Sequence, residues 1–237
     1  MQLFQLKDFN PPNPKLSSWM IDAYHCFNEK LTNKENKFPC IPAIAGYQLD
    51  QFRYGFTDEL TKDTTCKDVA SLLSHFGKVY KDIGKYPSLI LFFNNENKLK
   101  ISDYEKKFWN LLIKVSERDT IAWPKEIPEN PTHSLWEFCF EGERYFVYTA
   151  TPSHQKRQSR SFPYFMLGIT PRWVFDQFQL TKTAPSLKKR IRQRLKEYDS
   201  IEPHPALKLY GDSDNFEAKQ YFLRDDQSSF SQCPFHK

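Results

Sequence analysis

The stretch YPSLILFFNN, at residues 86–95, constrains the fold more than any other part of the sequence. Its continuous apolar run predicts a β-strand that is buried on both faces. Helical patterns flank it, because apolar residues recur on one face over residues 65–83 and again over residues 102–117. A buried strand between two amphipathic helices predicts a sheet with helices packed against it.

Alternating apolar and polar residues predict the other strands. Residues 51–56 alternate in this way, and so do residues 135–140 and 144–150. The last two runs are joined by Glu-Gly-Glu, which predicts a β-hairpin. Residues 162–170 predict one more strand directly after it.

Three more helices are expected elsewhere in the chain. Residues 16–31 carry apolar side chains at helical spacing, a short helix starts at Pro171, and residues 186–198 form a basic amphipathic helix. In the helix that follows the buried strand, Ser102 and Glu105 have the spacing of a capping box.

These elements predict an α+β fold, a single domain with a mainly antiparallel sheet and packed helices. The chain has 237 residues, of which 39% are hydrophobic, so it can bury a substantial core. Residues 1–15 are rich in Pro and Asn and predict an irregular arm. The domain itself is expected to span residues 16–237.

Several classes of protein are disfavoured by composition. Only 7 glycines are present and no Gly-rich phosphate loop occurs. The 5 cysteines include no CxxC pair, which favours reduced thiols and a cytoplasmic location over a disulfide framework. The N-terminus lacks the pattern of a signal peptide, and no apolar run approaches the roughly 18 residues of a membrane span.

One connection concentrates candidate binding groups. Between the strands that end near residue 150 and begin near residue 162 lie His154, Lys156, Arg157 and Arg160. A histidine with nearby cations could ligate a haem iron and pair with its propionates. The alternative is a solvated basic loop without function.

Cysteines provide a second set of candidates. Cys40 lies in a predicted turn that Pro39 and Pro42 stiffen, and its thiolate could ligate iron or act as a nucleophile. The alternative is a small buried apolar residue. Cys233 and His236 near the C-terminus could supply a ligand only if the terminus folds back over a pocket.

The charge distribution leaves two further options open. From Lys182 to Lys196 there are seven cations and no acid, so this helix could track a phosphate backbone, or it could be a solvated helix. The acids between residues 212 and 226 could bind a cationic substrate such as a guanidine, or form a solvated loop.

Several short motifs, taken in order, resemble the YqcI/YcgG family. They are FPC, RYGF, HQKRQSR, PRWVF and YGDSDNFEAKQYFLRDD, and the resemblance covers residues 38–237. Several characterised relatives in that family are haem-dependent oxygenases that N-hydroxylate guanidino compounds, notably arginine. The resemblance implies a haem b cofactor here. Where relatives often have Glu-Trp this chain has Glu217-Ala218, which puts the substrate in doubt.

The resemblance also implies roles for individual residues. His154 is the expected iron ligand, with Cys40 as the alternative. The cofactor-binding set is His154, Arg157, Arg160 and Arg53, and the catalytic set is Cys40, Glu217, Gln220 and Tyr221.

The predicted function is therefore a haem-dependent monooxygenase that N-hydroxylates a guanidino or amino compound. Its partners would be a small cationic substrate, dioxygen or peroxide, and an electron donor. No association with a membrane is expected. The alternatives are a haem-binding or haem-sensing protein without turnover and, less consistent with the modest net charge of +5, a nucleic-acid-binding module that uses the basic helix.

Overall fold

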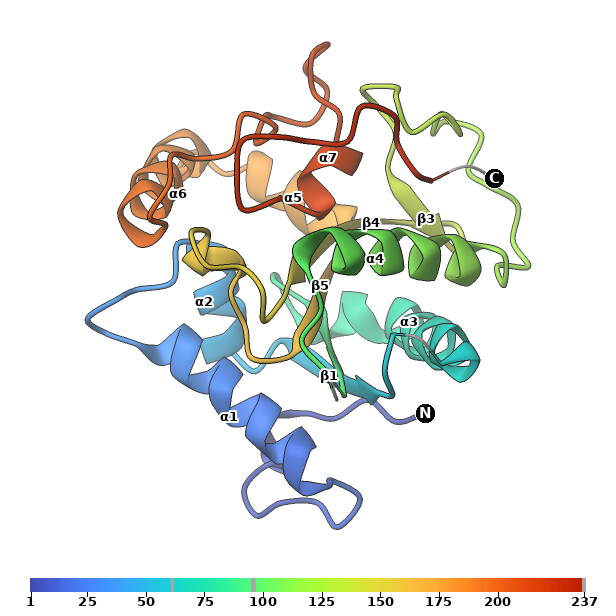
Figure 1. Cartoon of the computed structure of the whole chain (residues 1–237), viewed down its shortest axis with the longest axis vertical. Helices are drawn as coiled ribbons and strands as arrows, with labels where there is room; N and C mark the ends of the chain where they lie inside the picture. The colour runs from blue at the N-terminus through green and yellow to red at the C-terminus, as the bar shows by residue number, and fades with distance from the viewer. Residues whose placement is uncertain (61, 95–96, 236–237) are drawn as a thin grey trace.

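The computed structural model describes residues 1–60, 62–94 and 97–235, and it shows one five-stranded sheet with helices around it (Figure 1). The strand order is β1-β2-β5-β4-β3. The strands are β1 (Phe52–Thr57), β2 (Ser88–Phe93), β3 (Phe138–Phe140), β4 (Glu143–Ala150) and β5 (Phe165–Pro171). Only the β1–β2 pair is parallel, so the predicted α+β fold with a mainly antiparallel sheet is confirmed.

Strand β2 is buried along its whole length, as its apolar sequence predicts. It pairs with β1 on one side and with β5 on the other. Leu89, Leu91 and Phe93 belong to one core cluster, whereas Ile90 and Phe92 belong to a second. Because successive side chains of a strand point to opposite faces, β2 contributes to the core on both sides of the sheet.

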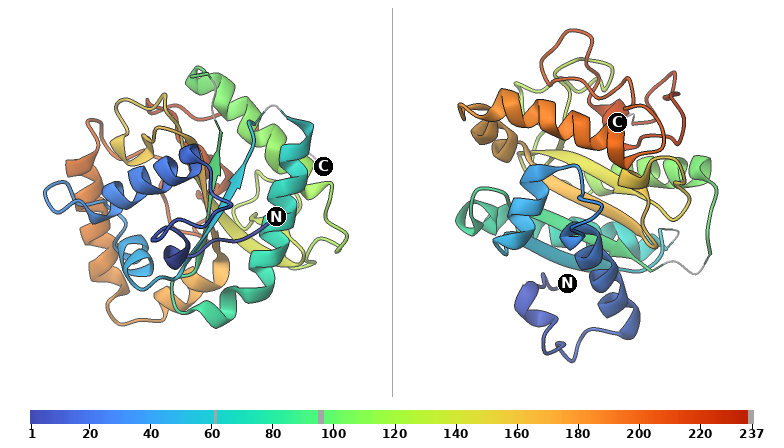
Figure 2. Two further views of the ribbon diagram at one scale, coloured as in Figure 1. Left: turned by 90° about the horizontal axis from the view of Figure 1, so that it is seen from below. Right: turned by 90° about the vertical axis from the view of Figure 1, so that its left-hand side faces the viewer.

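Helices cover both faces of the sheet, as the second set of views shows (Figure 2). Helices α3 and α4 lie on one face, and α1 and α2 lie on the other. In the described residues the helices are α1 (Ser18–Thr32), α2 (Ile41–Gln48), α3 (Asp63–Ile83), α4 (Ile101–Ser116), α5 (Arg172–Gln179), α6 (Ala184–Tyr198) and α7 (Ala218–Tyr221), with short 3-10 turns η1 (Leu6–Asp8) and η2 (Gln158–Arg160). No helix in this described part is both long enough and apolar enough to cross a membrane.

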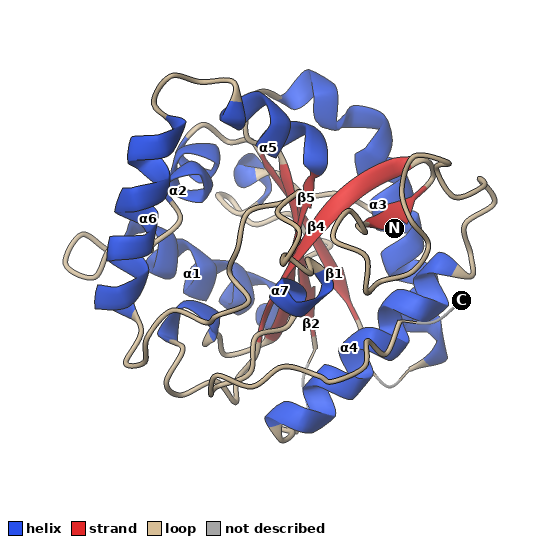
Figure 3. Cartoon of the chain, turned by 90° about the horizontal axis from the view of Figure 1, so that it is seen from above, coloured by secondary structure: helices blue, strands red, loops and turns tan. Residues whose placement is uncertain are grey.

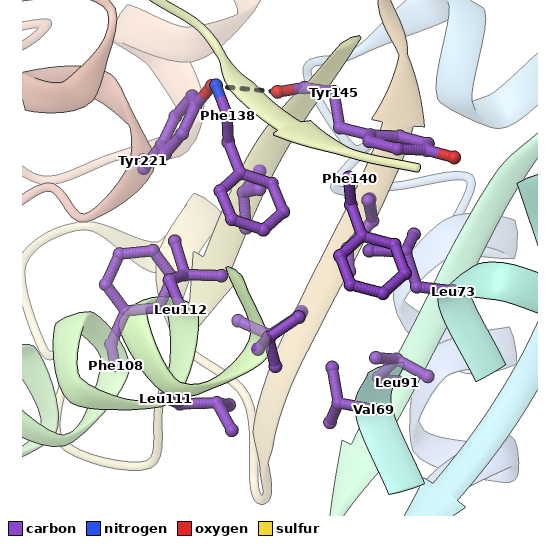
Figure 4. Packing of buried hydrophobic residues seen from close by; sticks show 14 of the residues in the cluster. Val69, Leu73, Leu91, Phe108, Leu111, Leu112, Phe138, Phe140, Tyr145 and Tyr221 are labelled. Atoms are coloured by element: carbon purple, nitrogen blue, oxygen red, sulfur yellow. Dashed lines mark hydrogen bonds between the residues drawn. The ribbon is translucent and has the colours of Figure 1, made fainter. Parts of the chain in front are cut away.

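The core between α3, α4 and the sheet is built from aliphatic and aromatic side chains (Figure 4). Val69 and Leu73 of α3 and Phe108 of α4 face Phe138 and Phe140 of β3 across it. Each of these side chains is less than 4% exposed. Burial of a side chain of this size contributes about 1.5 to 3 kcal/mol, so this layer accounts for much of the stability of the fold.

Two local predictions were wrong. Residues 41–48 form α2 instead of a stiff turn, because Pro42 lies in the first turn of the helix, where it removes no helical hydrogen bond. The predicted capping box at the start of α4 is absent. Lys100 is the N-cap, so Ser102 already lies within the helix and its side chain caps nothing.

The N-terminal arm is attached to the sheet. Phe4 exchanges two backbone hydrogen bonds with Tyr54 of β1, at 2.8 and 2.9 Å. Phe9 stacks on Tyr24 of α1 with the ring centroids 3.6 Å apart. Residues 1–15 therefore cover part of the α1 side of the sheet and contribute buried aromatic rings to its core.

Candidate functional site

A cavity of about 400 Å³ lies on the α2 side of the sheet, and α5 and α6 form two of its walls. Figure 3 shows these three helices grouped around the end of the sheet, with α7 nearby. The lining is largely apolar. Its apolar members include Phe38, Pro42, Ala43, Phe52, Phe146, Tyr148, Val174, Phe175, Phe178, Ile191, Leu195, Leu207 and Leu209. A cavity of this size and character is typical of a small-molecule site.

Helix α6 contributes one face to this cavity. Lys188, Ile191, Arg192 and Leu195 line it, and their spacing of three and four residues places them on the same side of the helix. The two apolar residues lie on the apolar side of the amphipathic helix that the sequence predicts over residues 186–198. The basic helix is therefore a wall of the cavity as well as a charged surface.

A buried group of ion pairs borders the cavity at the start of α5. Arg172 donates from Nε to Glu137 and from Nη2 to Glu217. All three side chains are at most 4% exposed. Arg144 also pairs with Glu137 at 3.2 Å, and the Tyr210 ring lies 4.3 Å from the Arg172 guanidinium carbon. Arg172 and Glu217 line the cavity, so it offers both signs of charge at one end.

The carboxyl group of Glu217 has a raised pKa in this buried position. Burial raises its pKa to about 7, although the neighbouring Arg172 acts in the opposite direction. Its Oε1 lies 3.0 Å from the Tyr221 hydroxyl, which also lies 2.8 Å from the Tyr145 carbonyl oxygen. Glu217 can therefore hold or release a proton near neutral pH while Tyr221 fixes its position.

His154 is buried away from this cavity. Its Nδ1 lies 2.9 Å from Thr151 Oγ1, and its Nε2 lies 2.7 Å from the carbonyl oxygen of Leu223. Only 3% of the residue is exposed, and burial lowers its pKa to about 4. Both ring nitrogens thus have protein partners, and the imidazole is neutral at pH 7.

The two arginines of the same connection bind backbone carbonyls. Arg157 donates to the carbonyl oxygens of Arg224, Glu202 and Asp226, and Arg160 donates to those of Thr149, Gln220 and Tyr221. Both residues are at most 4% exposed. Their guanidinium groups border the cavity, but these bonds use most of their donors.

Asp225 completes this set of contacts. Its carboxylate accepts the backbone N–H groups of Gln155, Lys156 and Arg157 at 2.8 to 3.0 Å. These bonds lower its pKa, in opposition to burial. The connection from His154 to Arg160 therefore holds the C-terminal segment against the sheet. The Asp225 carboxylate is part of this attachment, because it accepts the backbone N–H groups of the connection.

The burial of His154 predicts a pH-dependent stability. Its pKa is about 4 in the folded chain and 6.5 when exposed, so the unfolded chain binds the extra proton between these values. The folded chain should lose about 3 kcal/mol from this residue as the pH falls from 6.5 to 4. Urea unfolding measures this loss. As the pH falls from 6.5 to 4, the unfolding free energy of the native chain should approach that of His154→Gln, which lacks the titrating group. A constant difference would contradict the assignment.

Cys40 lies in the wall of the cavity as the N-cap of α2. Burial raises the pKa of its thiol, and the backbone N–H of Ala43 in the first turn of the helix acts in the opposite direction. The thiol is neutral by itself, but a bound metal ion would deprotonate it, and the helix N-terminus would stabilise the thiolate.

The remaining predicted residues are dispersed. Gln220 lines the cavity and donates to Asn215 Oδ1 at 2.7 Å, whereas Arg53 donates to the carbonyl oxygens of Asp50 and Phe52 and does not line it. Cys233 is buried in the core cluster between the sheet and helices α3 and α4.

His236 lies outside the described residues. Among those that are described, no three His, Cys, Asp or Glu side chains gather to hold a metal ion. A metal held by these described residues would therefore have at most two such side chains as ligands.

The sequence did not identify Arg172 and Glu137 as parts of the site. Arg172 lies in the PRWVF motif. Its position directly after a predicted strand could have suggested that it lies at the edge of the sheet, where a site is often found. Glu137 lies in the predicted hairpin, where a charged residue in an apolar alternation could have suggested a buried partner.

Comparison with known proteins identifies the family. The profile of the YqcI/YcgG family matches residues 27–236. Two relatives from Bacillus subtilis (strain 168), named as uncharacterized proteins YqcI and YcgG, are 46% and 42% identical over 100% and 93% of this chain and 95% and 89% of their own lengths.

A Streptomyces lavendulae protein with the provisional name N(omega)-hydroxy-L-arginine synthase DcsA is 25% identical over 93% of this chain and 85% of its own length. No solved structure matches. The family profile covers most of the chain, and the chain belongs to the YqcI/YcgG family.

Proposed function

We propose that this chain is a haem-dependent monooxygenase that N-hydroxylates a guanidino or amino compound resembling arginine. The observation that carries the proposal is the apolar cavity that has Cys40 in its wall and the ionisable Glu217 at one end. The name of the S. lavendulae relative supports the substrate class.

The lining is compatible with a porphyrin. Apolar and aromatic side chains suit a flat apolar ligand, and the volume of about 400 Å³ lies within the range of cofactor pockets. The hydrogen bonds of His154 favour the alternative ligand, Cys40, because its thiol lies in the cavity wall. When bound, haem would supply the activation of dioxygen or peroxide.

The charges near Glu217 favour a cationic substrate. When all groups are ionised, the carboxylates of Glu137, Asp176 and Glu217 exceed the guanidinium groups of Arg144 and Arg172 by one. Of this group only Arg172 and Glu217 line the cavity, so a substrate guanidinium would bind at Glu217. It would also lower the pKa of Glu217 and so favour the carboxylate that binds it. Each Glu217 oxygen keeps a lone pair for a further donor.

The proposed reaction converts a substrate N–H into N–OH. With dioxygen, one oxygen atom enters the N–H bond and the other leaves as water, and a donor supplies two electrons and two protons. With hydrogen peroxide, the second oxygen leaves as water without external electrons. Glu217 can exchange a proton at its carboxylate near neutral pH, and the apolar lining excludes bulk water from the substrate.

Turnover of arginine tests this proposal. Protein reconstituted with haemin and supplied with peroxide, or with dioxygen and a ferredoxin–reductase pair, should add one oxygen atom to arginine, as detected by mass spectrometry. Glu217→Gln should raise KM about tenfold or more, because the cation loses its charged partner. The control Glu202→Gln changes an exposed acid and should leave KM unchanged.

The pH profile makes this test more specific. The native KM should rise as the pH falls below 7, because Glu217 becomes protonated, whereas the KM of Glu217→Gln should stay flat over this range. Equal KM values and equal pH profiles would contradict the role of Glu217. Haem binding without product would favour the second candidate, a haem-binding protein without turnover.

A further inference from the structure

Two cations of α6, Lys188 and Arg192, line the cavity and have no carboxylate partner among the described residues. Lys188 makes no ion pair with any residue in the described ranges, and Arg192 donates only from Nη2 to the carbonyl oxygen of Leu207, at 3.1 Å. The neighbouring Lys208 differs, because it pairs with Asp214. Lys188 and Arg192 are four residues apart, a spacing at which like charges destabilise a helix.

We propose that Lys188 and Arg192 bind the anionic group of a ligand whose apolar body fills the cavity. Ile191 and Leu195, on the same face of α6, would contact that body. An anion here would relieve the repulsion between the two cations and form charge-assisted hydrogen bonds with both. The ligand is therefore an apolar or planar molecule with a carboxylate, and this inference deepens the proposed function of the same cavity.

This assignment differs from the one that the sequence suggests. Arg157 and Arg160 were expected to hold the propionates, but their guanidinium groups already donate to backbone carbonyls. Lys188 and Arg192 reach the cavity from its α6 wall with donors to spare. A carboxylate could come from a porphyrin propionate or from the carboxylate of an amino-acid substrate.

A simple apolar carboxylate tests the inference independently of any reaction. Dodecanoate should displace the fluorescent probe 8-anilinonaphthalene-1-sulfonate from the native chain. In Lys188→Gln/Arg192→Gln, the affinity for dodecanoate should fall about tenfold or more. Lys189→Gln/Arg190→Gln removes the same charge from the same helix at positions that do not line the cavity, and it should bind as the native chain does.

Equal affinity losses in the two double variants would overturn the inference, because they would indicate a general effect of surface charge. Absence of dodecanoate binding to the native chain would overturn it as well. Neither result depends on haem or on N-hydroxylation. Loss confined to Lys188→Gln/Arg192→Gln, in a chain that does not turn over arginine, would support this inference while the proposed function fails.

Two further comparisons identify the source of the carboxylate. If the propionates bind here, the variant should bind haemin more weakly in an absorbance titration but should bind haemin dimethyl ester as the native chain does. If the substrate carboxylate binds here, the variant should lose affinity for arginine, but not for decarboxylated arginine, in equilibrium dialysis. Unchanged affinity for all four ligands would contradict a role for either carboxylate.

Discussion

Arg172→Met should destabilise the folded chain by about 3 to 5 kcal/mol at pH 7. Arg172 lies between two buried carboxylates, and its removal leaves both Glu137 and Glu217 without their main counter-charge. The loss should be smaller at pH 5, because burial raises the pKa of Glu217 to about 7 and its protonation removes part of the uncompensated charge. Urea unfolding at both pH values measures it.

A triple variant provides the control for this result. Arg172→Met combined with Glu137→Gln and Glu217→Gln removes the charges together, and it should recover much of the lost stability. Arg144→Met should cost less than Arg172→Met, because the Arg144 side chain is 33% exposed and water can replace its contacts. A loss below about 1 kcal/mol for Arg172→Met would show that the ion pairs contribute little.

Arg160→Met should cost a similar amount, about 3 kcal/mol or more. The substitution removes the donors to three buried carbonyl oxygens, on Thr149, Gln220 and Tyr221, and each orphaned acceptor costs about 1 to 3 kcal/mol. It also removes the contact of the guanidinium with the Tyr148 ring, 4.2 Å from its centroid. Because these bonds join β4 to the C-terminal segment, limited proteolysis should cut that segment sooner in the variant.

Lys156→Ala is the matched control in the same connection. The described contacts of Lys156 to Asp225 and Ser200 use its backbone atoms, so they survive the substitution. The change in unfolding free energy should stay within about 0.5 kcal/mol. If Lys156→Ala and Arg160→Met lose equal stability, the buried donors of Arg160 are not what holds this region together.

The sequence predicted most of the secondary structure because local periodicity encodes it. The apolar run of β2 and the alternation of β4 depend on neighbouring residues alone. Helix α2 was missed because the two prolines around Cys40 suggested a turn, and a proline in the first turn of a helix has the same local appearance. Parallel pairing of β1 and β2 follows from the α3 crossover between them.

The site was harder to predict because its partners are distant in sequence. Glu137 and Arg172 are 35 residues apart, and Arg172 and Glu217 are 45 apart, so no spacing rule reveals the buried group. The sequence showed that His154 lies among cations. It could not show that carbonyl oxygens near the C-terminus would occupy the imidazole and both arginines.

The most direct measurement of the central claim, that the cavity binds haem beside Cys40, is an absorbance titration with haemin. The native chain and Cys26→Ala, whose thiol lies on α1 and does not line the cavity, should give the same Soret band at one equivalent. Cys40→Ala should shift or lose that band. An unchanged band in Cys40→Ala, or a native chain that leaves haemin free, would contradict the account.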